Sequence, residues 1–135
     1  PAFIEVYEKI ISTRLDAKKK KQLTRDKGLK IVINGAGGKF SDFWSTLYSP
    51  DLTIQMTVTG QLALLLFIEM LESSGIEVIS ANTDGVVMLV KKEKEEMLKQ
   101  VVSLWENKTN FITEETRYSG YYARDCNSYI ALVLE

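Results

Sequence analysis

The fold is decided by residues 49–90, which read SPDLTIQMTVTGQLALLLFIEMLESSGIEVISANTDGVVMLV. Ser49, Pro50 and Asp51 predict a helix start, because Ser caps the first turn, Pro has a helical φ and Asp faces the positive end of the helix. Glycine readily closes a helix, so we expect this one to end at Gly75. Its apolar side is too wide for a solvent-facing helix, which predicts that much of it lies in the core.

The pattern changes from helix to strand after this helix. The alternating residues 76–81 and the apolar run 86–90 flank the turn NTDG at residues 82–85. Tight hairpin turns need positive φ, and an Asp-Gly pair adopts it readily. The sequence therefore predicts an antiparallel hairpin with Asp84 at its tip.

Two helices are predicted before this region, and they form an N-terminal helical hairpin. Apolar residues at three- and four-residue steps continue through a basic run to about residue 23. A second helix is expected from Thr24 to the glycine-rich residues 35–38, which would end it. Residues 40–48 are aromatic and irregular, and they predict no regular element.

The C-terminal part completes the expected fold. Residues 92–107 predict an amphipathic helix, and residues 115–124 and 128–134 predict two strands. This order indicates an α+β fold, in which an antiparallel sheet carries helices on one face. Residues 1–40 form the helical hairpin domain and residues 41–135 the α+β domain.

Composition excludes several classes of site. The 135 residues contain no His and one Cys, Cys126, so His-dependent zinc sites, catalytic triads and internal disulfides are excluded. Any metal would be held by carboxylates and carbonyl oxygens, which favours Mg²⁺. The longest unbroken apolar run, residues 62–68, is shorter than the roughly 20 residues of a membrane span, and no secretory signal is readable. We therefore expect a reducing, cytoplasmic compartment and no membrane partner.

The net charge of −1 hides a basic block. Residues 14–30 hold eight basic and two acidic residues, so they carry +6 and the rest of the chain −7. Such a block attracts phosphate, although a solvated helix face explains it equally well. Lys30 and Asn34, four residues apart, share a helix face. Arg14 and Lys18 have the same spacing, so two antiparallel helices would form a basic groove suited to a triphosphate.

Two further places could carry chemistry, each with a plain alternative. Asp84 is either an ordinary turn aspartate or a metal ligand, and a second carboxylate on a neighbouring strand is not evident. The polar residues around Arg124, Asn127 and Tyr129 either face a nucleic-acid backbone or form a turn and a strand. Cys126 has no His or basic partner helix, which indicates a structural thiol rather than a nucleophile.

Three motifs, taken in this order, resemble those of family B DNA polymerases and cover essentially the whole chain. Residues 30–38, KIVINGAGG, resemble the fingers motif K-x-x-x-N-S-x-Y-G. Residues 80–86, SANTDGV, resemble the palm motif Y-G-D-T-D-S, and residues 127–129, NSY, resemble the K-x-Y motif. The short gap from Lys18 to Lys30 is similar to the compact fingers of phage and protein-primed members.

The resemblance implies a palm-type sheet with a fingers hairpin, and it implies roles for single residues. Asp84 would be the catalytic ligand of the Mg²⁺ ions, with Asn82 in the second shell of the metal site. The residues that would bind the incoming dNTP are Lys30, Asn34, Arg14 and Lys18. The residues that would contact the primer strand of primer–template DNA are Tyr129, Asn127 and Arg124. The N-terminal part of the polymerase is the remaining implied partner.

The chain also departs from the family pattern. Asn82 stands where the palm motif has its first Asp, and Asn127 replaces the Lys of the K-x-Y motif, where Arg124 would compensate. Gly35 and Gly37 replace the Ser and Tyr of the fingers motif. The motif with the other metal-binding Asp, D-x-x-S-L-Y-P-S, is absent. Since two-metal phosphoryl transfer needs at least two carboxylates, the chain is predicted to be inactive alone.

Three hypotheses follow for the function. The favoured one is a fragment of a family B-like, phage-type DNA polymerase that adds dNTPs to a primer 3′ end. The alternative is a non-catalytic nucleic-acid-binding module derived from a polymerase palm, and the third is a structural domain whose lysines only solubilise it. The wide apolar surface of residues 51–74 adds the hypothesis of a homo-oligomer formed through it.

Overall fold

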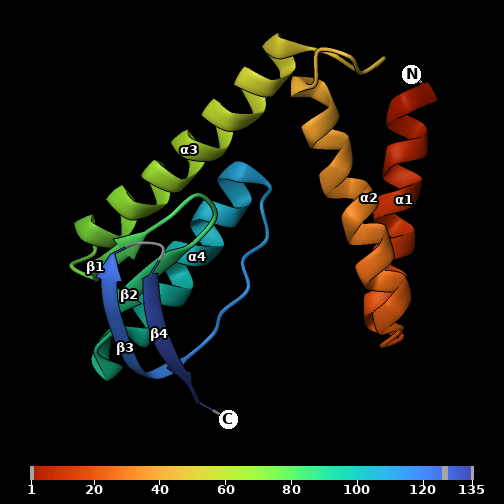
Figure 1. Cartoon of the computed structure of the whole chain (residues 1–135). Coiled ribbons are helices and arrows are strands. Elements are labelled where there is room, and N and C mark those ends of the chain that lie inside the picture. The colour runs from red at the N-terminus through yellow and green to blue at the C-terminus, as the bar shows by residue number, and fades with distance from the viewer. Residues whose placement is uncertain (1, 126–127, 135) are drawn as a thin grey trace. The chain divides into compact units, whose positions relative to one another are not determined.

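The structure, a computed structural model, describes residues 2–125 and 128–134 (Figure 1). Its elements are α1 (Ala2–Lys19), α2 (Leu23–Ser41), α3 (Pro50–Ser73), β1 (Glu77–Ala81), β2 (Val86–Leu89), the 3₁₀ turn η1 (Lys92–Lys94), α4 (Glu95–Thr109), β3 (Tyr118–Asp125) and β4 (Ser128–Val133). The predicted α+β class and the N-terminal helical hairpin are confirmed.

The chain divides into two units, Pro1–Met56 and Thr57–Glu135. The boundary falls inside α3, later than the predicted boundary after residue 40. The first unit holds α1, α2 and the start of α3, whereas the second holds the rest of α3, α4 and both β-hairpins.

α1 and α2 pack as an antiparallel pair in the first unit (Figure 1). The rings of Phe3 and Phe40 meet edge to face at one end of the pair, with their centroids 6.0 Å apart. The Tyr7 hydroxyl donates to the Ile33 carbonyl at 3.4 Å, which links the middles of the helices. Among the side chains described in this pair only Ala17 is buried, so the interface is thin and its few contacts matter.

α2 does not end at the glycine-rich residues 35–38, and that prediction is wrong. The helix continues to Ser41, and no glycine in it has a positive φ, so none forms a left-handed cap. The last turn is held by Phe40, whose ring packs on Phe3 and whose carbonyl accepts the Ser49 N–H at 2.8 Å. These contacts act against the helical cost of glycine, about 1 kcal/mol per residue.

α3 starts at Pro50 as predicted and ends in a Schellman cap at Gly75, which has a φ of +69°. The Gly75 N–H donates to the Glu72 carbonyl at 2.8 Å, and the Ile76 N–H donates to the Leu71 carbonyl at 3.0 Å. Leu71 and Ile76 are both fully buried. The cap therefore closes the helix and starts the core in the same few residues.

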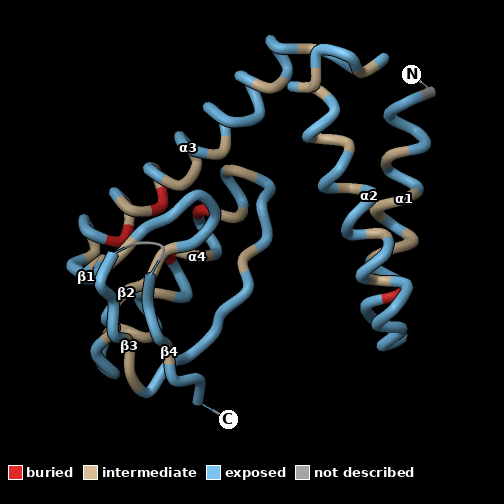
Figure 2. Tube along the Cα trace, in the orientation of Figure 1, coloured by how far each residue is buried: buried red, intermediate tan, exposed pale blue. Residues whose placement is uncertain are grey.

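The core of the second unit lies where α3 and α4 cover the β1–β2 hairpin (Figure 2). Its buried side chains are Phe67, Leu71, Ile76, Val101 and Trp105. The Trp105 indole N–H donates to the Ala63 carbonyl at 2.8 Å, and its ring centroid lies 5.0 Å from that of Phe67. Partly buried side chains of both strands pack against this cluster, so the hairpin rests on a firm base.

Only the C-terminal part of α3 is a core helix. Phe67 and Leu71 are buried, whereas Ile54 and Leu62 are 62% and 60% exposed. Among the described residues, α3 is the helix that is long and apolar enough to cross a membrane by length and composition, and 17% of its apolar window is buried. Core helices of the same length and composition meet that criterion too.

The strands form two separate antiparallel hairpins. β1 pairs with β2, with a bulge between Val78 and Ser80, and β3 pairs with β4. In the part of the chain that the structure describes, strand pairing stays within each hairpin, so there is no continuous four-stranded sheet. We expected one antiparallel sheet with helices on one face. In the structure α3 and α4 pack on the two-stranded β1–β2 sheet, and β3 and β4 form a separate sheet.

Two glycine substitutions test this description in opposite directions. Gly35→Ala places a Cβ in open space inside α2, so we expect the free energy of unfolding to rise by about 0.5–1 kcal/mol. Gly75→Ala forces a left-handed backbone on alanine, so we expect a loss of about 1–2 kcal/mol. Urea unfolding followed by circular dichroism measures both, and a destabilised Gly35→Ala variant would show that α2 is not continuous.

Candidate functional site

Asp84 lies at the tip of the β1–β2 hairpin, as the sequence predicted. The turn is closed by the Asn82 N–H, which donates to the Gly85 carbonyl at 2.9 Å, and the Asn82 side-chain oxygen accepts the Thr83 N–H. All four turn residues are exposed, and none has a positive φ. The hairpin is thus confirmed, while the left-handed Asp-Gly geometry expected as its cause is wrong.

The carboxylate of Asp84 is exposed at the hairpin tip. It makes no ion pair with any described residue, and it projects from a hairpin whose base is packed on the core. Within residues 2–125 and 128–134 no group of three His, Cys, Asp or Glu side chains could hold a metal ion. The Asn82 oxygen is already turned toward the Thr83 N–H. Among the described residues Asp84 therefore belongs to no group of three possible metal ligands, and a pair of Mg²⁺ ions needs at least two carboxylates.

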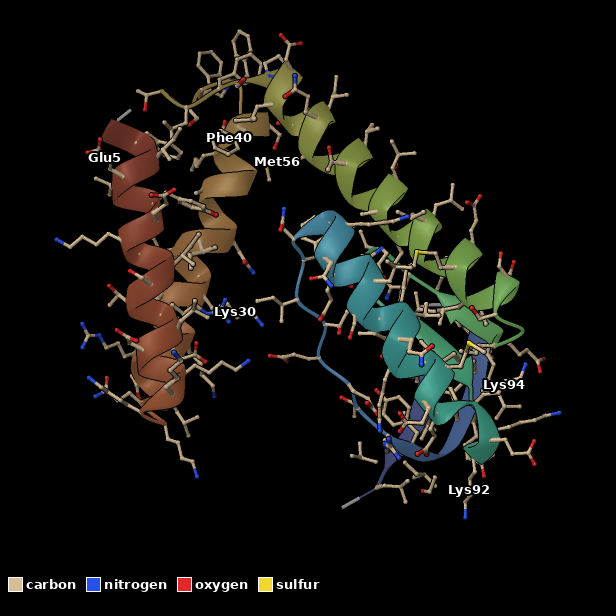
Figure 3. The ribbon with its side chains drawn as sticks, turned by 180° about the vertical axis from the view of Figure 1, so that it is seen from behind. Glu5, Lys30, Phe40, Met56, Lys92 and Lys94 are labelled. Atoms are coloured by element: carbon tan, nitrogen blue, oxygen red, sulfur yellow. The ribbon has the colours of Figure 1, made fainter. Side chains whose placement is uncertain are left out.

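Lys30 and Asn34 share one face of α2, as their spacing predicted. Both are exposed, and Lys30 projects outward from the helical pair (Figure 3). The side of α2 that meets α1 carries Asp26, Ile33 and Phe40, so Lys30 and Asn34 flank that seam. An ammonium and a carboxamide on one exposed helix face can both donate to phosphate oxygens.

Arg14 differs from the predicted groove. Its Nε donates to Asp26 Oδ1 at 3.0 Å, and the two side chains are 29% and 22% exposed, so the guanidinium points into the seam between α1 and α2. Lys18, one turn further along α1, is exposed. In this structure Arg14 therefore joins the two helices, and the outward donors of the expected groove are Lys30, Asn34 and Lys18.

Tyr129 lies in β4 at the end of a row of tyrosine rings. Its ring centroid is 5.2 Å from that of Tyr121, which stacks on Tyr118 at 6.4 Å. Tyr129 is 49% exposed. The sequence did not predict this row, because the bulges of β3 decide which tyrosines share a face.

The other predicted DNA contacts are only partly placed. Arg124, on β3, has an 83% exposed side chain, and its Nε donates to Asp125 Oδ2 at 3.1 Å. Asn127 and Cys126 lie outside the described residues.

The irregular residues 42–49 form an ordered aromatic loop between α2 and α3. The Trp44 N–H donates to Asp42 Oδ1 at 3.1 Å, and Lys39 Nζ donates to Asp42 Oδ2 at 2.7 Å. Chiefly the hydrogen bond from Lys39, and then that from Trp44, lower the pKa of the Asp42 carboxyl below its ordinary value. Phe43 and Tyr48 meet edge to face at 5.4 Å. The sequence showed the aromatic residues but gave no sign of the Asp42 turn that orders them.

Two comparisons with known proteins were made, one with family models and one with curated proteins. No protein-family model matches the chain, and no curated protein matches it either. The resemblance to family B DNA polymerases therefore rests on the motifs of the sequence alone.

The ion pair between Arg14 and Asp26 is testable by a double-mutant cycle. Arg14→Ala, Asp26→Ala and the double variant are expected to give a coupling energy of about 0.5–1 kcal/mol, because the pair is partly shielded from water. Urea unfolding measures the change in the free energy of unfolding of each of the three variants relative to the wild type. The exposed pair of Lys99 and Glu96, at 2.7 Å within α4, is the matched control and should couple less. A coupling of zero between Arg14 and Asp26 would contradict the role of Arg14 as a link between the two helices.

Proposed function

We propose that the chain is part of the fingers and palm of a family B-like DNA polymerase, of the phage or protein-primed type. The parent protein would bind primer–template DNA and a dNTP and extend the primer 3′ end in the cytoplasm of a bacterial or phage-infected cell. The order of the three motifs supports this proposal. Two structural features agree with it: Asp84 lies at the tip of a hairpin, and Lys30 and Asn34 lie on one face of the helical hairpin.

The position of Asp84 is the observation that carries the proposal. A carboxylate at the tip of a short hairpin is exposed, because the two strands of the hairpin do not cover it, and it can contact a bound ion. The β1–β2 hairpin is held against α3 and α4 by Val78, Val86 and Met88, so the carboxylate has a fixed base. Bound Mg²⁺ would lower the barrier for attack of the primer 3′-hydroxyl on the α-phosphate.

The remaining residues would act on the nucleotide and the primer. Lys30 would neutralise charge on the triphosphate as an ammonium donor, and Asn34 would donate its amide hydrogens from the same helix face. Tyr129 would offer its half-exposed ring and hydroxyl to the primer terminus. The exposed apolar residues of α3 support contact with further protein, either the rest of the polymerase or a second copy.

One observation favours the alternative, a non-catalytic nucleic-acid-binding module. Asn82 stands beside Asp84 with its side-chain oxygen engaged in the turn, and among the described residues Asp84 belongs to no group of three possible metal ligands. Such a module would keep the basic hairpin for phosphates and would need no metal.

Primer extension tests the catalytic part of the proposal. We expect the purified 135-residue chain to incorporate no nucleotide with Mg²⁺ or Mn²⁺, because one carboxylate cannot hold two ions about 3.5–4 Å apart. The reading frame upstream separates the two functions: a strand of the D-x-x-S-L-Y type supports the enzyme. Incorporation by the chain alone that is abolished in Asp84→Ala would contradict the expected inactivity.

The role of Lys30 is testable in the longer polymerase. Lys30→Ala should raise the KM for dNTP by about 10- to 100-fold, the usual worth of one hydrogen bond to a charged group, with little change in DNA affinity. Lys19→Ala, which removes an exposed charge from the end of α1, is the matched control and should leave the KM unchanged. A change in DNA affinity alone would show that Lys30 contacts DNA and not the nucleotide.

A further inference from the structure

The bend between α1 and α2 gathers positive charge that the site described above does not use. Residues 20–27, the basic bend, hold four basic residues and one acidic residue, Asp26, which is bonded to Arg14 at 3.0 Å. Figure 3 shows nitrogen-tipped side chains pointing outward around the end of the helical pair that lies opposite Phe40. The four basic side chains are exposed and form no ion pair with a described residue: Lys20, Lys21, Arg25 and Lys27.

A pocket opens at this bend. Its volume is about 170 Å³, far more than the roughly 10–15 Å³ that one water molecule needs, so a phosphate group fits. A guanidinium can donate to two phosphate oxygens at once, and an ammonium adds a further donor. Two such cations and one carboxylate are among the residues that line it: Thr13, Asp16, Ala17, Lys20, Gln22 and Arg25. The pocket therefore suits one phosphate group, held chiefly by Arg25 and Lys20.

The backbone of the bend is fixed by its own hydrogen bonds. The Gln22 N–H donates to the Ala17 carbonyl at 2.9 Å, and the Lys21 N–H donates to the Lys18 carbonyl at 3.1 Å. Lys21 has a φ of +54°, in the left-handed region that favours glycine and makes a Cβ costly. The backbone therefore gives no reason for a lysine at this position, which points to a role of its side chain.

The bend offers charge without aromatic rings and without an apolar face. Residues 14–30 include no aromatic residue, so bases would find no ring to stack on. Leu23 is the one apolar residue of the basic bend, whereas a helix that lies on a lipid surface needs a whole apolar face. Several exposed cations around one bend match the closely spaced charges of a phosphodiester chain. These features favour a nucleic-acid backbone over a lipid surface.

We propose that the basic bend binds the phosphate backbone of a nucleic acid and seats one phosphate between Lys20 and Arg25. The inference rests on the proposed function, in which DNA is a partner. It goes beyond that function because the residues assigned to DNA there belong to the C-terminal hairpin, and the polymerase-like motifs include none of residues 20–27. Contacts to phosphates carry no base preference, so the bend would add affinity and not sequence selection.

Salt dependence measures how many phosphates the bend contacts. Fluorescence anisotropy of a labelled DNA duplex of about 20 base pairs should show binding whose log Kd rises with log salt concentration by about 0.9 per phosphate. Arg25→Ala and Lys20→Ala should each lower that slope by about 1 and weaken binding about 5- to 10-fold at about 0.1 M salt. The matched control is Lys9→Ala, which removes an exposed charge about three turns along α1 from the bend and should leave the slope unchanged.

Two further variants separate binding from folding. Lys21→Gly removes an ammonium and relieves the left-handed backbone, so it should weaken binding while the midpoint of urea unfolding stays the same or rises. Asp16→Asn removes the carboxylate from the pocket and should tighten binding about 2- to 5-fold. Neither result can arise from a loss of folded protein.

Three results would overturn the bend as a DNA site. The first is DNA binding whose slope is the same for the wild type, Arg25→Ala and Lys20→Ala, and it would leave the proposed function standing. The second is no binding of the duplex to the wild type at about 0.05 M salt. The third is binding to phosphatidylserine vesicles or polyglutamate, weakened in Arg25→Ala, without binding to DNA. The proposed function has its separate test in the reading frame upstream, whose outcome does not depend on what the bend binds.

Discussion

The second unit depends on the chain reversal at Gly75. A left-handed glycine lets the last carbonyls of α3 find N–H partners, and the same turn brings Leu71 and Ile76 into the core. Lys94 of η1 donates its ammonium to the Gly75 carbonyl, so the start of the α4 segment is fastened to the same point. The direction of β1, and with it the position of the hairpin tip, follows from this one backbone conformation.

Local signals in the sequence predicted the elements whose causes are local. The start of α3 at Pro50 and its end at Gly75 follow from capping rules that involve only neighbouring residues. The shared face of Lys30 and Asn34 follows from the helical repeat in the same way. The continuation of α2 through residues 35–38 did not follow, because it depends on the contact between Phe3 and Phe40.

The same distinction between local and long-range causes applies to the candidate site. Its residue types and their order could be read from the motifs, and the tip position of Asp84 agrees with the structure. The engagement of Arg14 with Asp26 could not be read, because it depends on how α1 is rotated against α2. The separation of the strands into two hairpins was hidden for a similar reason, since strand order is set by long-range packing and not by alternation.

The backbone conformation of residues 82–85 has a consequence for mutational tolerance. No residue of this turn occupies the left-handed region, and a Cβ at Gly85 would meet no atom within 4 Å. Backbone geometry therefore demands neither Asp at 84 nor Gly at 85, and the fold can accept many side chains at both. Any strict preference for an acidic residue at position 84 among functional variants would report chemistry and not folding.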